Sequence, residues 1–262
     1  MKTTLMAAAG VSMASIAALA ELPPHLEEAI TNAAAVTEAK AYTNAAGASL
    51  NYRFRAPAKV EPGKRYPLVL FLHGAGSRGS DNTRQLCNGV WPILSYMKAK
   101  GMEGYLIAPQ CPKGQKWWGF VDGKLTAEPS APMALVLEIL DKAIKELPVD
   151  AGRVYVTGLS MGGSGTWDII LRRPDFFAAA MPICGRGDPA LASRIRNLPI
   201  WVFHGDCDNV VPPSCSRKMV SALWQCDGNV RYREYPGVGH NCWVATYADP
   251  TVLDWFFGQA KK

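Results

Sequence analysis

Short apolar runs that alternate with helical patterns constrain the fold of this chain most strongly. Leu68–Leu72 is a continuous apolar run, which is typical of a strand covered on both faces of a parallel sheet. Similar runs recur at 105–108, 154–157, 178–183 and 200–203. Helical patterns lie at 133–147, 162–173, 214–226 and 250–258. This alternation predicts an α/β protein with a mostly parallel central sheet flanked by helices.

The chain is interpreted as one folded domain. Its 262 residues are enough to bury a large core, and neither a Ser/Gly/Pro-rich linker nor an internal repeat divides it. We assign residues 45–262 to this domain and 21–44 to an N-terminal leader segment with a helical stretch at 26–39. Lys and Arg number 28 against 22 Asp and Glu, a net charge of +6, but the basic residues are scattered. The charge pattern therefore gives no reason to expect a nucleic-acid partner.

The first twenty residues have the features of a secretory signal peptide. A positive start at Lys2 is followed by an uncharged stretch rich in Ala, Met and Leu, and Ala18-Leu19-Ala20 matches an A-x-A cleavage site. The alternative is a helix retained in the mature protein, but Gly10 and the lack of a polar face argue against it. We expect a secreted or periplasmic protein. No later stretch approaches the roughly 20 apolar residues that a membrane-spanning helix needs.

A Gly-x-Ser-x-Gly motif lies between a predicted strand and a predicted helix. Gly158-Leu159-Ser160-Met161-Gly162 follows the apolar run 154–157 and begins the helix at 162–173. In that context the serine occupies a sharp, strained turn that exposes its hydroxyl above a helix N-terminus. Ser160 is therefore a candidate nucleophile.

A serine nucleophile needs a base, and the base needs an orienting acid. His240 follows the predicted strand 230–235 on a loop at the carboxyl end of the sheet, where open α/β sheets place their sites. We predict that His240 is the base. Two carboxylates, Asp206 and Asp208, follow the strand 200–203, and either could be the acid.

At this segment the sequence resembles the α/β-hydrolase superfamily. The residues from His204 to Pro212 match the pattern His-Gly-x-x-Asp-x-x-Val-Pro, in which the aspartate is the triad acid. The resemblance selects Asp208 and leaves Asp206 as a turn residue. The run His73-Gly74-Ala75-Gly76 after the early strand fits an oxyanion loop, so we expect the backbone N–H groups of Ala75 and Met161 to form the oxyanion hole. His73 itself is expected to orient this loop.

The resemblance narrows to one secreted branch of that superfamily. His-Gly-Ala-Gly at 73–76, Ala108-Pro109-Gln110-Cys111-Pro112 and Trp117-Trp118 are similar to the phospholipase/carboxylesterase, or dienelactone-hydrolase-like, branch. That branch is similar to feruloyl and acetylxylan esterases and to polyhydroxybutyrate depolymerases. The resemblance implies a serine carboxylic-ester hydrolase with a Ser160–His240–Asp208 triad, an acyl-enzyme intermediate and no cofactor. Ser160 argues against a true dienelactone hydrolase, whose nucleophile is a cysteine.

Three other functions share parts of this sequence pattern. A prolyl-oligopeptidase-type serine peptidase shares these motifs but normally carries a gating domain. A polyester depolymerase shares the branch. A non-catalytic binding protein on the same scaffold would usually have lost a triad residue, and none is missing here.

The sequence also gives expectations about the substrate. Only short intervals separate Ser160, Asp208 and His240, which leaves no room for a cap domain and predicts an open site. A bulky ester, such as a feruloyl or acetyl group on a polysaccharide, would fit such a site. Trp117, Trp118 and Trp243 are candidate substrate-binding residues, because aromatic faces stack on sugar and aryl rings. The alternative for each indole is packing within the domain.

Seven cysteines and four histidines bear on disulfides and metals. Cys207 precedes Asp208 and Cys242 follows His240 by two residues, so the Asp208–His240 hydrogen bond would bring their loops together. The arrangement resembles secreted polyester hydrolases that tie the same loops, and we predict a Cys207–Cys242 disulfide, with two free thiols as the alternative. No Cys-x-x-Cys pair and no His pair at ligand spacing occurs, so we expect no metal site.

Cleavage of the signal peptide gives a direct test of export. If the A-x-A site is used, the exported protein should begin at Glu21. N-terminal sequencing or the intact mass of the exported protein measures this. Retention of residues 1–20 would contradict both the signal peptide and the extracytoplasmic location.

Overall fold

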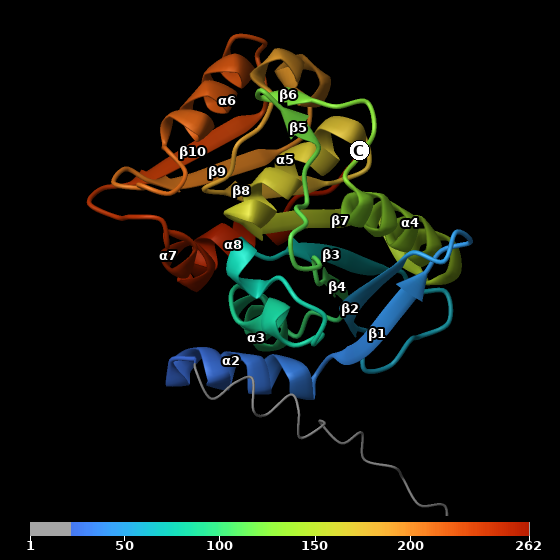
Figure 1. Cartoon of the computed structure of the whole chain (residues 1–262). Coiled ribbons are helices and arrows are strands. Elements are labelled where there is room, and N and C mark those ends of the chain that lie inside the picture. Colours follow the sequence, from blue (N-terminus) through green and yellow to red (C-terminus); the bar gives the residue numbers. More distant parts are fainter. Residues whose placement is uncertain (1–21, 262) are drawn as a thin grey trace, which may run out of the picture.

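A computed structural model describes residues 22–261, and its centre is an eight-stranded sheet with the order β1-β2-β4-β3-β7-β8-β9-β10 (Figure 1). The strands are β1 (Glu38–Thr43), β2 (Ser49–Arg55), β3 (Tyr66–Leu72), β4 (Tyr105–Pro109), β7 (Val149–Leu159), β8 (Ala179–Ile183), β9 (Ile200–Gly205) and β10 (Val230–Tyr235). Every pairing from β4 to β10 is parallel, whereas β1, β2 and β4 pair antiparallel at one edge. The predicted α/β class and mostly parallel sheet are confirmed.

Helices cover both faces of the sheet. They are α2 (Pro24–Ala35), α3 (Val90–Ala99), α4 (Ala131–Glu146), α5 (Met161–Arg172), α6 (Ser214–Trp224), α7 (Trp243–Ala248) and α8 (Pro250–Phe257). Side chains of α4, α5 and α6 share one core with Leu68 and Leu70 of β3, and those of α2, α3 and α8 share another with Val69 and Phe71. Alternate residues of β3 thus face opposite cores, which explains why the run 68–72 is apolar throughout.

The N-terminal segment belongs to the same folded body. Residues 24–43 form α2, which packs beside α3, and β1, which pairs with β2. The boundary drawn at residue 45 therefore falls within a β-hairpin, and β1 was not predicted. The signal-peptide assignment, 1–20, lies outside the described residues. Among residues 22–261, no helix combines the length and apolar character that crossing a bilayer requires.

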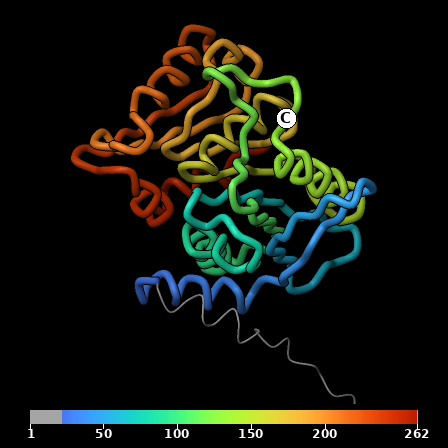
Figure 2. The backbone as a smooth tube through the Cα atoms, in the orientation of Figure 1, coloured from blue at the N-terminus to red at the C-terminus, as the bar shows by residue number. Residues whose placement is uncertain are grey.

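The elements between Ser160 and His240 pack on the sheet or belong to it. They are α5, β8, a 3-10 helix η3 (Pro189–Ile195), β9, α6 and β10, which matches the expected lack of room for a cap. A longer excursion occurs after β4, where residues 110–130 cross the molecule and form a small hairpin of β5 (Phe120–Val121) and β6 (Lys124–Leu125) (Figure 2).

The parallel strands bring the candidate site residues to one edge of the sheet. β3 ends before His73, β7 ends before Ser160, β9 ends before Asp208 and β10 ends before His240. The end of β3 also packs tightly on the turn after β7. A Cβ atom added to Gly162 would lie 1.8 Å from the carbonyl oxygen of Leu72. This contact requires glycine and fixes the serine turn against the loop that follows β3.

Gly162→Ala should destabilise the protein strongly, because the added methyl group meets a rigid backbone carbonyl. We expect the free energy of unfolding in urea to fall by about 2–4 kcal/mol. Gly76→Ala is the matched control, since a Cβ atom there meets nothing within 4 Å. Equal stability of the two variants would contradict the close contact.

Candidate active site

Ser160 lies in the strained turn that its motif predicts. Its backbone has φ 55° and ψ −113°, an uncommon conformation for a residue with a side chain, and it directly precedes α5. The N–H of Ser160 donates to the carbonyl of Ile183 on β8 at 2.9 Å. The turn is thus held between two strands.

The three predicted triad residues form a continuous hydrogen-bonded chain. Ser160 Oγ lies 2.8 Å from His240 Nε2, and His240 Nδ1 lies 2.7 Å from Asp208 Oδ2. Because an ionised carboxylate only accepts, the neutral ring carries its proton on Nδ1 and leaves Nε2 to accept from the serine hydroxyl. This arrangement can take a proton from Ser160.

Asp208 has a fully buried side chain and Asp206 an exposed one. Burial by itself raises the pKa of Asp208, but hydrogen bonds from His240, Val211 and Val210 outweigh it, so the pKa lies below its usual value. Asp206 instead accepts the N–H of Gly237 at 2.7 Å, as a turn residue would. The geometry favours Asp208 as the partner of His240.

A second histidine, for which the sequence predicted no role, lies beside the acid. His204, near the end of β9, is fully buried, and its Nε2 lies 3.1 Å from Asp208 Oδ2. The available signal was that His204 is the first residue of the His-Gly-x-x-Asp-x-x-Val-Pro match, four residues before Asp208. Burial lowers the pKa of His204, so the ring is neutral near pH 7.

The predicted oxyanion donors are the backbone N–H groups of Ala75 and Met161, which begin η1 (Ala75–Ser77) and α5. Within residues 22–261, neither N–H has a hydrogen-bond acceptor. Gly74 adjoins the nucleophile, since a Cβ atom placed on it would lie 3.7 Å from the Cβ of Ser160. Both donors therefore flank Ser160.

His73 orients this loop through hydrogen bonds. Its Nδ1 donates to the carbonyl of Gly74 at 2.6 Å, and its Nε2 accepts the N–H of Cys111 at 2.9 Å. That carbonyl and the N–H of Ala75 belong to one planar peptide unit and point in opposite directions. The hydrogen bond to His73 therefore fixes the direction of the Ala75 N–H. Burial lowers the pKa of His73 to about 4, although the bond to Gly74 opposes the shift.

The sequence model of the phospholipase/carboxylesterase family matches residues 58–249, which contain all of these groups. The chain belongs to this family. A bifunctional acetylxylan esterase/xylanase from Neocallimastix patriciarum is 29% identical over 171 residues, 65% of this chain but 23% of the relative. Feruloyl esterase B from Thermothelomyces thermophilus is 24% identical over 230 residues, covering 74% of this chain and 77% of the relative.

A solved structure gives the same result for the fold. A thermostable esterase is 38% identical, with a TM-score of 0.81, and the match covers 87% of this chain and 64% of that one. The predicted α/β-hydrolase fold is confirmed. The chain spans about a quarter of the length of the first relative and under two thirds of the solved esterase.

Of the three tryptophans predicted to bind substrate in this carboxylesterase-family chain, one is buried. The expectation that Trp117 binds substrate is wrong, because its side chain has no exposed surface. Its Nε1 donates to the carbonyl of His73 at 3.1 Å, and its ring packs edge-on against that histidine. Trp117 therefore supports His73 and the loop that follows β3.

Trp118 and Trp243 remain partly exposed. The ring of Trp243 stands perpendicular to that of His240 with centroids 5.3 Å apart, and its Nε1 donates to Asn88. Trp118 packs against the core that contains Leu68 and Leu70, and the ammonium group of Lys116 lies 5.5 Å from its ring. Trp243 therefore borders the candidate site, whereas within residues 22–261 no hydrogen bond or ring contact links Trp118 to it.

The predicted Cys207–Cys242 disulfide is not present in the structure. All seven cysteines are free thiols; Cys207 is exposed and contacts Asp206, whereas Cys242 is fully buried. The two loops do meet, but Cys242 points inward to the thiol of Cys184, which directly follows β8. Adjacency of the loops did not determine the direction of their side chains.

Cys184, Asp208 and His240 are the one cluster in the described residues that could offer a metal ion three ligands. The atoms involved lie within 4.8 Å of one another. Burial and the Cys242 thiol raise the pKa of Cys184, so its sulfur is protonated near neutral pH, and a metal ion would have to displace that proton. Asp208 and His240 are already hydrogen-bonded to each other. This donor set suits proton transfer better than metal binding.

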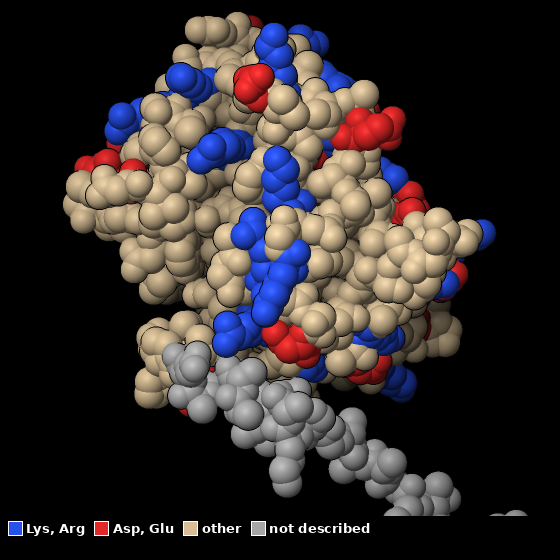
Figure 3. All heavy atoms as spheres, in the orientation of Figure 1, with Lys and Arg blue, Asp and Glu red and all other residues tan. Residues whose placement is uncertain are grey.

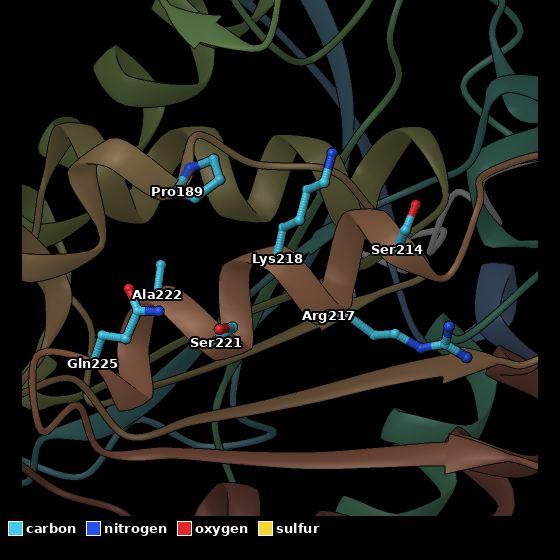
Figure 4. Close-up of a pocket in the computed structure, with 7 residues that line it drawn as sticks. All are labelled: Pro189, Ser214, Arg217, Lys218, Ser221, Ala222 and Gln225. Atoms are coloured by element: carbon cyan, nitrogen blue, oxygen red, sulfur yellow. The ribbon is translucent and has the colours of Figure 1, made fainter.

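A surface hollow of about 420 Å³ lies elsewhere, between η3 and α6 (Figure 4). It is lined by Pro189, Ser214, Arg217, Lys218, Ser221, Ala222 and Gln225. None of these residues belongs to the predicted site. The charge of its Arg217 is already paired with Glu234 of β10. The hollow therefore gives no reason to move the candidate site from Ser160.

The low pKa of His73 predicts how stability depends on pH. Between about pH 6.5 and 4 the unfolded chain binds a proton there that the folded protein excludes, so stability falls as pH decreases. From pH 7 to pH 5, wild type should lose about 2 kcal/mol more unfolding free energy than His73→Asn, which keeps a donor toward Gly74. Urea unfolding at both pH values measures this. Identical pH dependence would contradict a neutral, buried His73.

Proposed function

We propose that this chain is an exported serine carboxylic-ester hydrolase that works through an acyl-enzyme intermediate. The observation that carries the proposal is the hydrogen-bonded chain from Ser160 through His240 to Asp208. The two unpaired N–H groups beside Ser160 add to it, since developing negative charge on a carbonyl oxygen needs such donors.

In the first half-reaction Ser160 Oγ attacks the ester carbonyl while His240 Nε2 takes the hydroxyl proton. The tetrahedral oxyanion accepts hydrogen bonds from the N–H groups of Ala75 and Met161. The imidazolium is stabilised by Asp208 and gives its proton to the departing alcohol as the ester C–O bond breaks. The products are the alcohol and an acyl group on Ser160.

In the second half-reaction water replaces the alcohol. His240 takes a proton from the water, whose oxygen attacks the acyl carbonyl, and the same N–H groups bind the second oxyanion. The bond to Ser160 Oγ then breaks, and His240 returns the proton to the serine. The acid is released and the starting enzyme is restored.

The substrate we propose is a bulky ester, such as an acetyl or feruloyl group on a polysaccharide. Two relatives named acetylxylan esterase/xylanase and feruloyl esterase support this class. The lack of room for a cap between Ser160 and His240 supports an open site, and Trp243 offers a ring beside the histidine. Export is supported by the signal-like residues 1–20 and by a relative from Arthroderma benhamiae named as a secreted protein, 27% identical over 224 residues.

The function is tested with purified protein on short-chain p-nitrophenyl esters, methyl ferulate and acetylated xylan. Wild type should hydrolyse at least one of these esters. Ser160→Ala should remain folded and lose at least ~10³-fold in kcat/KM, because only binding and the oxyanion donors remain. Full activity in the alanine variant would remove Ser160 as the nucleophile.

The two aspartates provide a matched pair of variants. Asp208→Asn should lower kcat by at least ~10²-fold, because an amide cannot stabilise the imidazolium. Asp206→Asn removes the same charge two residues away, without contact to His240, and should leave kcat within about twofold. The reverse order would assign the acid role to Asp206.

Esters with a ring in the acyl or alcohol part should be preferred over long alkyl esters and over amides. A ring can stack near Trp243 for about 0.5–1.5 kcal/mol, whereas a long chain needs a tunnel or lid. An amide leaving group must be protonated to depart, while an alkoxide leaves more easily. We expect kcat/KM for methyl ferulate or an acetylated sugar to exceed that for a C12 ester, with Trp243→Ala reducing the difference. Preference for the C12 ester or a peptide anilide would favour a lipase or a peptidase.

A further inference from the structure

His204 has three polar contacts in a fully buried position. Its Nε2 lies 2.8 Å from the carbonyl of Val211 and 3.1 Å from Asp208 Oδ2, and its Nδ1 lies 2.7 Å from Ser216 Oγ on α6. The ring therefore links β9, the turn that carries Asp208, and α6. The proton relay from Ser160 through His240 does not include it.

The neighbours of His204 determine its tautomer. A backbone carbonyl and an ionised carboxylate only accept, so Nε2 carries the proton and donates to Val211 and Asp208. In the neutral ring Nδ1 then accepts from the hydroxyl of Ser216. His204 is consequently a fixed donor that is shared between the Val211 carbonyl and the Asp208 carboxylate.

Asp208 has four donors around a carboxylate with no exposed surface. Oδ1 accepts the N–H groups of Val210 and Val211, at 2.8 and 2.9 Å. Oδ2 accepts from His240 and from His204. His204 is thus the one donor among the described residues that shares Oδ2 with His240.

We propose that His204 is a positioning residue, which holds Oδ2 of Asp208 in line with His240 and sets how strongly the Asp208–His240 pair retains a proton. The proposal rests on the proposed ester hydrolysis only for its kinetic readout. His204 does not reach the substrate, so its loss acts on kcat rather than on KM.

The proposal fixes the direction of a pH effect. A donor to Asp208 stabilises the negative charge, so removing it makes the coupled pair hold a proton more tightly. The acid limb of the kcat/KM profile should therefore move to higher pH. Other titratable groups near the pair are the thiols of Cys184 and Cys242. Glu234 lies opposite His204 on the neighbouring strand β10, and its carboxylate forms an ion pair with Arg217. All of them are unchanged in the variants below.

Two amide variants at position 204 form a matched pair. His204→Gln places its NH₂ group near the former Nε2 and retains a donor to Asp208. His204→Asn places its amide near the former Nδ1, where it meets Ser216 but cannot reach the carboxylate. His204→Asn should lower kcat about 10-fold or more with KM within about twofold, and should raise the acid limb by about one pH unit. His204→Gln should stay close to wild type, as should the exposed-site control His25→Gln.

Equal kinetics of the two amide variants, or an unmoved acid limb in His204→Asn, would overturn the positioning role. If His204→Asn does not fold, Ser216→Ala tests the same link from α6, and unchanged kcat in that variant would overturn the proposal.

A readout without substrate separates this inference from the proposed function. The low-field NMR signal of the His240 Nδ1 proton should move in His204→Asn and not in His204→Gln, even if no ester is hydrolysed. An unmoved signal in both variants would reject the role.

Discussion

The arrangement of the whole candidate site depends on the buried carboxylate of Asp208. Its charge has no access to water, and a charge in that position is tolerated only when hydrogen bonds replace the lost solvation. Those donors come from its own turn, from β9 through His204 and from the loop after β10 through His240. Three segments of the chain are held together by one anion, and the ring of His240 is thereby aimed at Ser160.

On the opposite side of Ser160, backbone contacts rather than a buried charge hold the segments together. Gly162 allows the serine turn to touch the end of β3, and the loop that follows β3 is held by His73 and, behind it, by Trp117. Both side chains are buried and uncharged near pH 7, so they orient peptide groups without adding a field of their own. In the proposed mechanism, Ser160 thus lies between a base supported by an anion and two backbone N–H donors, which is the arrangement that acyl transfer requires.

Periodicity predicted the sheet and its helices because these elements are covered on defined faces, and strand–turn–helix context identified Ser160. Selecting Asp208 over Asp206 required a family resemblance, since both follow the same strand. The direction of a loop side chain has no periodic signal, which is why Trp117 was placed in the substrate cleft and Cys242 against Cys207. β1 was not predicted because its residues are mostly exposed and give no apolar pattern. Figure 3 shows a band of Lys and Arg side chains along the middle of one face, although these residue types form no long run in the sequence.

Covalent labelling with a fluorophosphonate tests the central claim most directly, because such a reagent reacts with a serine activated by a neighbouring base. The account predicts a single adduct by intact mass, located on Ser160 by peptide mapping, with much slower labelling of Asp208→Asn than of Asp206→Asn. Ester hydrolysis by a protein that remains unlabelled, or an adduct on a different serine, would contradict it.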